Sequence, residues 1–115
     1  MEVKGENYHV IHDPATATLT FQGALRMRGM VAYAPIMQLL DKVVAQAPAT
    51  ITMDLRELQF SNSSGISVLF QFVIKIREQG SSNLIVRGSE QIFWQKKSLE
   101  NLRRLMAGMQ LEWSE

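Results

Sequence analysis

Alternating polar and apolar residues near the start of the chain predict two short β-strands. The first covers residues 8–12, and the turn signal Asp13-Pro14 separates it from the second, which covers residues 16–22. In the second segment threonines alternate with apolar residues, as in a strand with one buried face. The residues expected on that face are Ala17, Leu19 and Phe21. Because the turn is so short, the two strands are expected to pair as an antiparallel hairpin.

Three longer segments have apolar residues at the i, i+3, i+4 and i+7 spacing of an amphipathic helix. The first is expected over about residues 31–45 and the third between Ser98 and Gly108. The second, over about residues 63–78, is apolar around most of its circumference, so we expect it to be largely buried. Its polar side chains form one narrow stripe, which consists of Ser67, Gln71, Lys75 and Glu78.

Three apolar runs between and after these helices predict further strands. They cover residues 50–55, 84–86 and 109–113, and the β-branched run at 84–86 suggests a strand covered on both faces. The predicted order is therefore β-β-α-β-α-β-α-β, with crossover helices after an opening hairpin. We expect an α/β fold in which a mixed sheet of four to five strands is packed by helices. The expected core residues are Leu19, Phe21, Leu39, Leu40, Ile51, Met53, Leu69, Val73, Ile76, Ile85 and Leu102.

The size and charge of the chain narrow the classes of protein to which it can belong. With 115 residues it is expected to form one domain over residues 1–115, and its net charge of +1 lacks the basic excess of nucleic-acid-binding proteins. It has no apolar segment long enough for a membrane span and no signal-like start. The absence of cysteine excludes disulfides and thiolate metal sites, and it suits a reducing cytosol. We therefore expect a cytoplasmic protein without nucleic-acid or membrane partners.

Few residues offer catalytic or metal-binding chemistry. His9 and His12 stand three positions apart on a predicted strand, so their side chains point to opposite faces and do not converge on a metal. Asp54 ends a predicted strand, as a receiver-type phospho-acceptor does, but the acidic cluster of such a site is missing and a bracing role is expected. No set of nucleophile, base and orienting group can be assembled. We expect no enzyme activity, no metal and no cofactor.

A polar run, Ser61-Asn62-Ser63-Ser64-Gly65, separates the strand at 50–55 from the largely apolar helix. Serine and asparagine are preferred N-cap residues, so capping of that helix is the simplest role for the run. With Asp54-Leu55 and Phe60 before it, however, the stretch resembles the signature of STAS domains of the anti-sigma-factor-antagonist type. The resemblance extends to chain length, element order and the Gly23-Ala24-Leu25 sequence at the end of the second strand.

The resemblance implies a partner-switching regulatory protein. In antagonists of this type a partner kinase phosphorylates one hydroxyl residue of the motif, which corresponds here to Ser64 or alternatively to Ser63. The implied partners are an anti-sigma factor or a related ATPase-type serine kinase, and a PP2C-type phosphatase that reverses the reaction. Such a protein takes part in signal transduction and transcription regulation in bacteria. Self-association into a homodimer stays an open alternative.

We expect the partner surface to gather around this motif. Residues 24–29 are expected to form an exposed loop, and the polar stripe is the wet face of the helix that begins at the motif. The expected contact residues are Arg26, Arg28, Ser61, Asn62, Gly65, Ser67, Gln71 and Lys75. Asn62 stands where the family usually has aspartate, and the loop is basic where the family is usually acidic. Asn62 therefore favours one alternative, a scaffold domain that does not cycle. A small-molecule sensor is a further alternative that the resemblance implies, and no feature of the sequence supports it.

Overall fold

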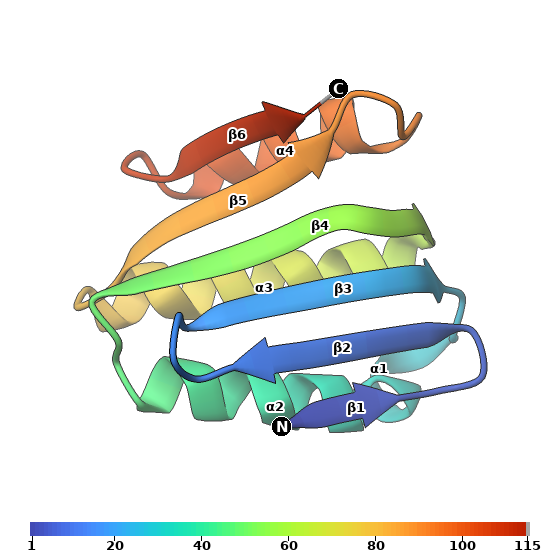
Figure 1. Cartoon of the computed structure of the whole chain (residues 1–115), viewed down its shortest axis with the longest axis horizontal. Helices are drawn as coiled ribbons and strands as arrows, with labels where there is room; N and C mark the ends of the chain where they lie inside the picture. Colours follow the sequence, from blue (N-terminus) through green and yellow to red (C-terminus); the bar gives the residue numbers. More distant parts are fainter. Residues whose placement is uncertain (115) are drawn as a thin grey trace.

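Six strands form one mixed β-sheet in the computed structural model, which describes residues 1–114 (Figure 1). The strands lie side by side in chain order: β1 (Glu2–Lys4), β2 (Tyr8–Asp13), β3 (Thr18–Leu25), β4 (Thr50–Ser61), β5 (Asn83–Ser89) and β6 (Gln110–Ser114). Neighbours from β1 to β3 are antiparallel, and neighbours from β3 to β6 are parallel. The mixed α/β class is confirmed, with one strand more than expected. Strand β1 was missed because Val3, between two charged residues, gives too short a pattern to detect.

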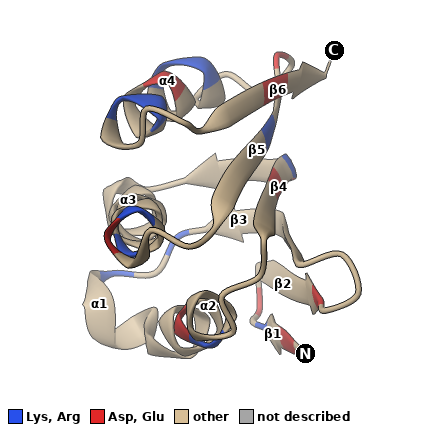
Figure 2. Cartoon of the chain, turned by 90° about the vertical axis from the view of Figure 1, so that its left-hand side faces the viewer, with Lys and Arg blue, Asp and Glu red and all other residues tan. Residues whose placement is uncertain are grey.

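Four helices connect the parallel strands: α1 (Gly29–Ala32), α2 (Ala34–Ala45), α3 (Ser63–Gln79) and α4 (Gln95–Leu105). All four lie on the same face of the sheet (Figure 2). This arrangement follows from the strand order, which advances across the sheet in one direction from β3 to β6. Because crossovers between parallel strands are right-handed, each helix returns over the same face.

The other face of the sheet has no helix over it (Figure 2), which corrects the expectation that β5 is covered on both faces. Ile85 on β5 is half-buried, and it is the one residue of the predicted core that is not fully buried. This open face carries an ion pair within β4, between Arg56 and Asp54 (2.7 Å), and another between β5 and β6, from Arg87 to Glu112 (3.1 Å). A mixed sheet with one dry and one solvated face can carry such charges without desolvating them fully.

The helix-covered face holds the hydrophobic core. The sheet contributes buried apolar residues from β2 to β5, and the helices contribute the stripes predicted from the sequence. The fully buried large side chains include Leu19, Phe21, Leu25, Tyr33, Ile36, Ile51, Met53, Leu55, Leu58, Leu69, Phe72 and Ile76. Full burial of one such side chain contributes about 1.5–3 kcal/mol, so this layer holds the helices against the sheet.

Two element boundaries differ from the prediction close to the motif. Gly23 does not end β3: its φ is +90°, and a Cβ added there would stand 2.2 Å from the carbonyl oxygen of Asn7. The glycine lets the strand bend past that carbonyl and continue to the buried Leu25, so the expected loop begins two residues later than predicted. The helix expected over 31–45 is broken at Tyr33 into α1 and α2.

Strand β4 continues to Ser61, beyond its predicted end at residue 55. Two register shifts against β3 place extra residues of β4 in bulges, which the alternation of a regular strand does not predict. Asp54 braces the first bulge, where its carboxylate accepts the backbone N–H of Arg56 (3.1 Å) and two guanidinium hydrogen bonds (3.0 and 2.7 Å). The motif therefore follows an irregular strand end and not a long loop.

Candidate partner-binding site

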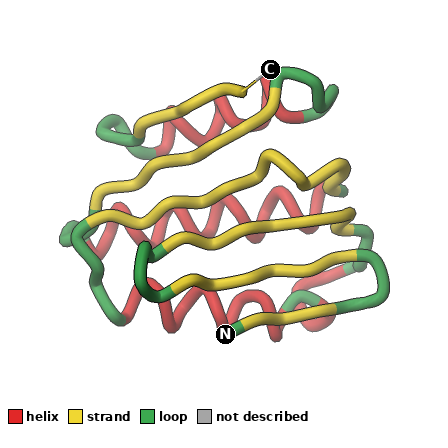
Figure 3. The backbone as a smooth tube through the Cα atoms, in the orientation of Figure 1, coloured by secondary structure: helices red, strands yellow, loops and turns green. Residues whose placement is uncertain are grey.

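The carboxyl ends of β3, β4 and β5 lie at one edge of the sheet because these strands are parallel (Figure 3). The loops at this edge lead into α1, α3 and α4 respectively. Ser63 and Ser64, the predicted phosphorylation sites, are the first two residues of α3. The edge therefore brings the motif next to two loops from distant parts of the chain.

Asn62 is the N-cap of α3 and ties three elements together. Its Oδ1 accepts the backbone N–H of Gly65 (2.9 Å) and the hydroxyl of Tyr33 (3.0 Å), while its Nδ2 donates to the carbonyl oxygen of Met27 (2.7 Å). Its backbone N–H also donates to the carbonyl oxygen of Leu25 (2.9 Å). An aspartate could accept the first two bonds but could not donate to Met27, so asparagine fits this position better.

Ser61 and Gly65 are buried and form the floor of the site. A Cβ added at Gly65 would stand 2.3 Å from the Oγ of Ser61 and 3.0 Å from the Cβ of Leu25. Glycine is required at position 65 because a side chain would clash with these atoms. The backbone there is helical, so its conformation alone would allow other residues. Both residues were predicted to contact a partner, and their burial places them beneath the exposed surface.

The two motif serines differ in their surroundings. The Ser63 side chain is exposed, whereas Ser64 is half-buried and its Oγ accepts the backbone N–H of Gly29 at 3.4 Å. No acidic residue occupies the first turn of α3. The positive end of the helix dipole and the N–H groups of this turn can therefore accommodate a negative group on either serine.

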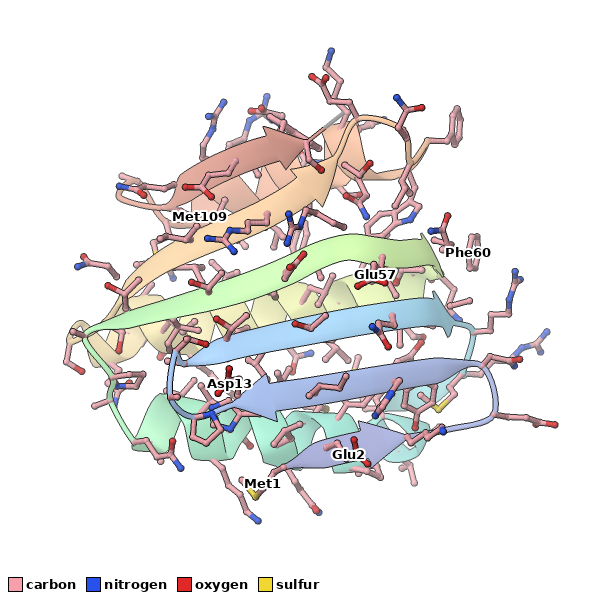
Figure 4. All side chains as sticks on the ribbon, in the orientation of Figure 1. Met1, Glu2, Asp13, Glu57, Phe60 and Met109 are labelled. Atoms are coloured by element: carbon pink, nitrogen blue, oxygen red, sulfur yellow. The ribbon has the colours of Figure 1, made fainter. Side chains whose placement is uncertain are left out.

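A basic and aromatic rim borders the serines. Arg26 and Arg28 are exposed, and neither forms an ion pair with another residue in the range 1–114. The guanidinium of Arg26 lies 4.5 Å from the ring centroid of Phe60, within the range of a cation–π contact. Phe60 is 37% exposed and projects from the end of β4 (Figure 4). Beside Arg26, a hollow of about 290 Å³ opens toward the loop between β1 and β2.

Three further apolar side chains at this edge were not predicted from the sequence. Met30 and Val31 in α1 are 38% and 90% exposed, and Phe93 in the loop before α4 is 101% exposed. The next residue, Trp94, donates from Nε1 to the carbonyl oxygen of Gln59 (3.1 Å), which places this loop beside the end of β4. Val31 does not occupy one of the apolar-stripe positions of the predicted helix. This was the one feature of the sequence that could have indicated its exposure.

The polar stripe of α3 leads away from the edge. Ser67 is exposed, Gln71 contacts the sulfur of Met30 (3.9 Å), and Lys75 forms an ion pair with Asp41 on α2 (2.6 Å). Lys75 lies about 18 Å along the helix from its first residue, at 1.5 Å per residue. The structure thus joins the first half of the predicted stripe to the serine pair, while Lys75 lies against α2.

Other candidate chemistry lies elsewhere. Burial alone would raise the pKa of Asp54, but the hydrogen bonds and charge of Arg56 outweigh it and lower this pKa, so the carboxylate stays ionised on the open face. His12 is buried, whereas His9 pairs with Glu2 on the opposite face. Across residues 1–114, no three His, Cys, Asp or Glu side chains are grouped to hold a metal. No helix in this part of the chain is long and apolar enough to cross a membrane.

Solved structures with the same fold include two bacterial regulators. The apo form of SiaC from Pseudomonas aeruginosa is 12% identical, with a TM-score of 0.75 over 100% of this chain and 98% of that chain. A chain of the complex between the diguanylate cyclase SiaD and its activator SiaC, from the same organism, is 12% identical, with a TM-score of 0.74 over 99% of both chains. An anti-sigma factor antagonist from Mycobacterium paratuberculosis is 18% identical, with a TM-score of 0.65 over 96% of this chain and 90% of that chain.

These identities are low enough that the structural likeness establishes the fold alone. No curated protein sequence matches the chain significantly. The family is established by the sequence itself, because residues 15–97 match the STAS domain, and this segment contains the complete motif and its helix. The chain belongs to the STAS domain family.

Proposed function

We propose that this protein is a regulatory adaptor that binds a protein partner at the edge around its serine pair, and that serine phosphorylation switches this binding off. Ser64 is the proposed phosphorylation site, with Ser63 as the alternative. One observation carries the proposal: the exposed large apolar side chains gather around the serines, beside two arginines, and such gatherings are uncommon on a solvated surface. We call this surface the docking edge; it consists of Arg26, Arg28, Met30, Val31, Phe60, Ser63, Ser64 and Phe93.

A phosphate on this surface would oppose binding without unfolding the domain. It adds about −1.5 to −2 charges at pH 7. The helix N-terminus stabilises that charge in the unbound protein. In a complex the same charge must lose its water or face the acidic groups of a partner, which costs several kcal/mol.

The relatives support a protein partner but leave its identity to experiment. SiaC is an activator found in complex with a diguanylate cyclase, and another relative is an anti-sigma factor antagonist. We propose an anti-sigma factor or a related ATPase-type serine kinase as the partner, together with a PP2C-type phosphatase. Arg26 and Arg28 favour a partner whose contact surface is acidic.

The test combines mass analysis with binding. Protein purified from its native host should carry one phosphate, mapped to Ser64 or Ser63. Ser64→Asp should fold normally and lose affinity for the partner kinase, although aspartate carries less charge than phosphate and its effect is smaller. Ser64→Ala should bind and resist release. An absence of phosphate under every growth condition, together with wild-type binding by both variants, would refute the switch.

A scaffold that binds constitutively is the second candidate. Asn62 favours it, since the family usually places aspartate there and the charge is lost. The bond from Asn62 to Met27 offers a structural reason for the asparagine, however, and this reason requires no loss of phosphorylation. The same mass analysis separates the two functions, because a scaffold would bind its partner without ever carrying phosphate.

A further inference from the structure

Helix α1 is attached loosely to the rest of the protein. None of its four residues is buried, and its N-cap, Arg28, makes no side-chain capping bond. Val31 in its middle is 90% exposed. Such a segment contributes little to the core and can change position at low cost.

Both ends of this segment are fixed by Asn62. Before α1, Nδ2 of Asn62 donates to the carbonyl oxygen of Met27. After α1, Oδ1 of Asn62 accepts the hydroxyl of Tyr33, whose side chain is fully buried. Between these anchors, Gly29 has a φ of +78°, and a Cβ added there would meet no atom within 4 Å. Gly29 therefore faces open space, and as a glycine it can change its backbone angles more freely than its neighbours.

Two side chains of α3 contact the segment between the anchors. The Oγ of Ser64 accepts the N–H of Gly29 (3.4 Å), and Nε2 of Gln71 lies 3.9 Å from the sulfur of Met30. Ser63, one position earlier on α3, makes no such contact in the described part of the chain. The two motif serines are thus unequal with respect to α1.

We propose that Ser64 sets the position of α1, and that phosphorylation of Ser64 moves α1 whereas phosphorylation of Ser63 does not. The proposal rests on the proposed function for its regulatory meaning. In the reaction Oγ bonds to the γ-phosphorus of a nucleoside triphosphate, the bond to the diphosphate leaving group breaks, and the hydroxyl proton is released. The acceptor for Gly29 then becomes a terminal phosphate oxygen, which lies further from α3 than Oγ does.

The charge acts in the same direction as the geometry. Arg28 adjoins Gly29, and a phosphate dianion forms strong charge-assisted hydrogen bonds with arginine and with backbone N–H groups. Helix α1 therefore has to shift to remain bonded. Because α1 carries Met30 and Val31, phosphorylation of Ser64 rearranges the apolar part of the docking edge as well as adding charge to it.

The test needs neither the kinase nor the partner. Phosphoserine is incorporated genetically at position 64 or at position 63, and amide chemical shifts of the full chain are compared with those of the unmodified protein. We expect the amides of residues 29–32 to shift in the Ser64-phosphorylated chain and to stay in place in the Ser63-phosphorylated chain, which has the same added charge. Equal shifts in both chains, or none in α1, would overturn the proposal.

A second measurement removes the acceptor without adding charge. In Ser64→Ala the Gly29 amide should exchange with solvent about two- to tenfold faster, as expected for the loss of one hydrogen bond, and Ser63→Ala should leave it unchanged. An unchanged Gly29 amide in Ser64→Ala would also contradict the proposal. Both outcomes are independent of phosphorylation in the host, so they separate this inference from the proposed function.

Discussion

At the scale of single residues, Asn62 shows how one side chain can meet several demands. It accepts two hydrogen bonds and donates one, and its partners belong to three separate segments of the chain. Capping could be predicted from the sequence, because asparagine before an apolar helix is a preferred N-cap. The bonds to Tyr33 and Met27 could not, because both partners lie about thirty residues away and are brought close only by the parallel pairing of β3 and β4.

Replacement of Asn62 with aspartate tests the donor to Met27. We expect Asn62→Asp to lower the free energy of unfolding by about 1 kcal/mol, the net value of one hydrogen bond, less a small gain from the helix dipole. Asn62→Ala, which removes all three bonds, should cost about 2 kcal/mol or more. Urea unfolding followed by circular dichroism measures both, and the exposed Asn83→Asp should stay within about 0.5 kcal/mol of wild type. Full stability of Asn62→Asp would show that the donor is dispensable.

His12 makes the stability of the domain depend on pH. Its Nδ1 is buried without a hydrogen-bond partner among the described residues, and burial, with a smaller effect of the amino group of Met1, lowers its pKa below the ordinary value of 6.5. Below about pH 7 the unfolded chain therefore binds more protons at this residue than the folded chain. The free energy of unfolding consequently decreases as the pH is lowered. We expect the free energy of unfolding to decrease from about pH 7 to about pH 5, and to decrease less in His12→Leu. A wild-type slope in His12→Leu would refute this assignment.

At the scale of elements, predictability followed the length and regularity of the local pattern. Helix α3 was located within one residue, because a long apolar segment lies between an N-cap and Gly80, whose φ of +75° ends the helix. Strand β4 was predicted too short, because its bulges interrupt the alternation that identifies a strand. Helix α1 was merged with α2, because the apolar pattern does not show where one helix stops and the next begins. Pro35 lies in the first turn of α2, where it has no N–H to bond back to α1.

Helix α4 contains a buried polar residue that the sequence does not distinguish from its exposed neighbours. Gln95 is fully buried: its Nε2 donates to the carbonyl oxygens of Leu55 (2.6 Å) and Leu58 (3.1 Å), and its Oε1 accepts the N–H of Ser89 (2.8 Å). The backbone pairing of β4 with β5 ends at Asp54. Gln95 therefore replaces the missing strand pairing where the two strands separate.

Loss of the Gln95 amide should destabilise the whole sheet. We expect Gln95→Ala to lower the free energy of unfolding by at least about 2 kcal/mol, since each buried polar group left without a partner costs about 1–3 kcal/mol. Denaturant unfolding measures this change. The exposed Gln91→Ala in the preceding loop is the matched control and should be nearly neutral. A neutral Gln95→Ala would mean that water replaces the amide in full.

At the scale of the whole molecule, the one-directional strand order separates three surfaces. The helices cover one face, ion pairs and threonines occupy the open face, and the carboxyl ends of the parallel strands form the docking edge. Apart from Met1, each large apolar side chain that is strongly exposed within residues 1–114 belongs to this edge. The sequence alone could not reveal this gathering, because Val31, Phe60 and Phe93 are far apart in the chain.

Charge reversal at the docking edge tests whether a partner binds there. We expect the double variant Arg26→Glu and Arg28→Glu to weaken the complex with the partner kinase at least about tenfold, chiefly through slower association, because an acidic partner surface would be repelled where it was attracted. Wild-type affinity should fall as salt is added, and that of the variant should change little.

The melting temperature of the double variant should stay near that of the wild type, since both arginines are exposed and unpaired with any described acid. Arg104→Glu, exposed in the last turn of α4, reverses one charge away from the docking edge and should bind normally, because α4 runs from the docking edge toward the opposite edge. Equal weakening by Arg104→Glu would indicate a general effect of net charge, and unchanged binding of the double variant would place the partner on another surface.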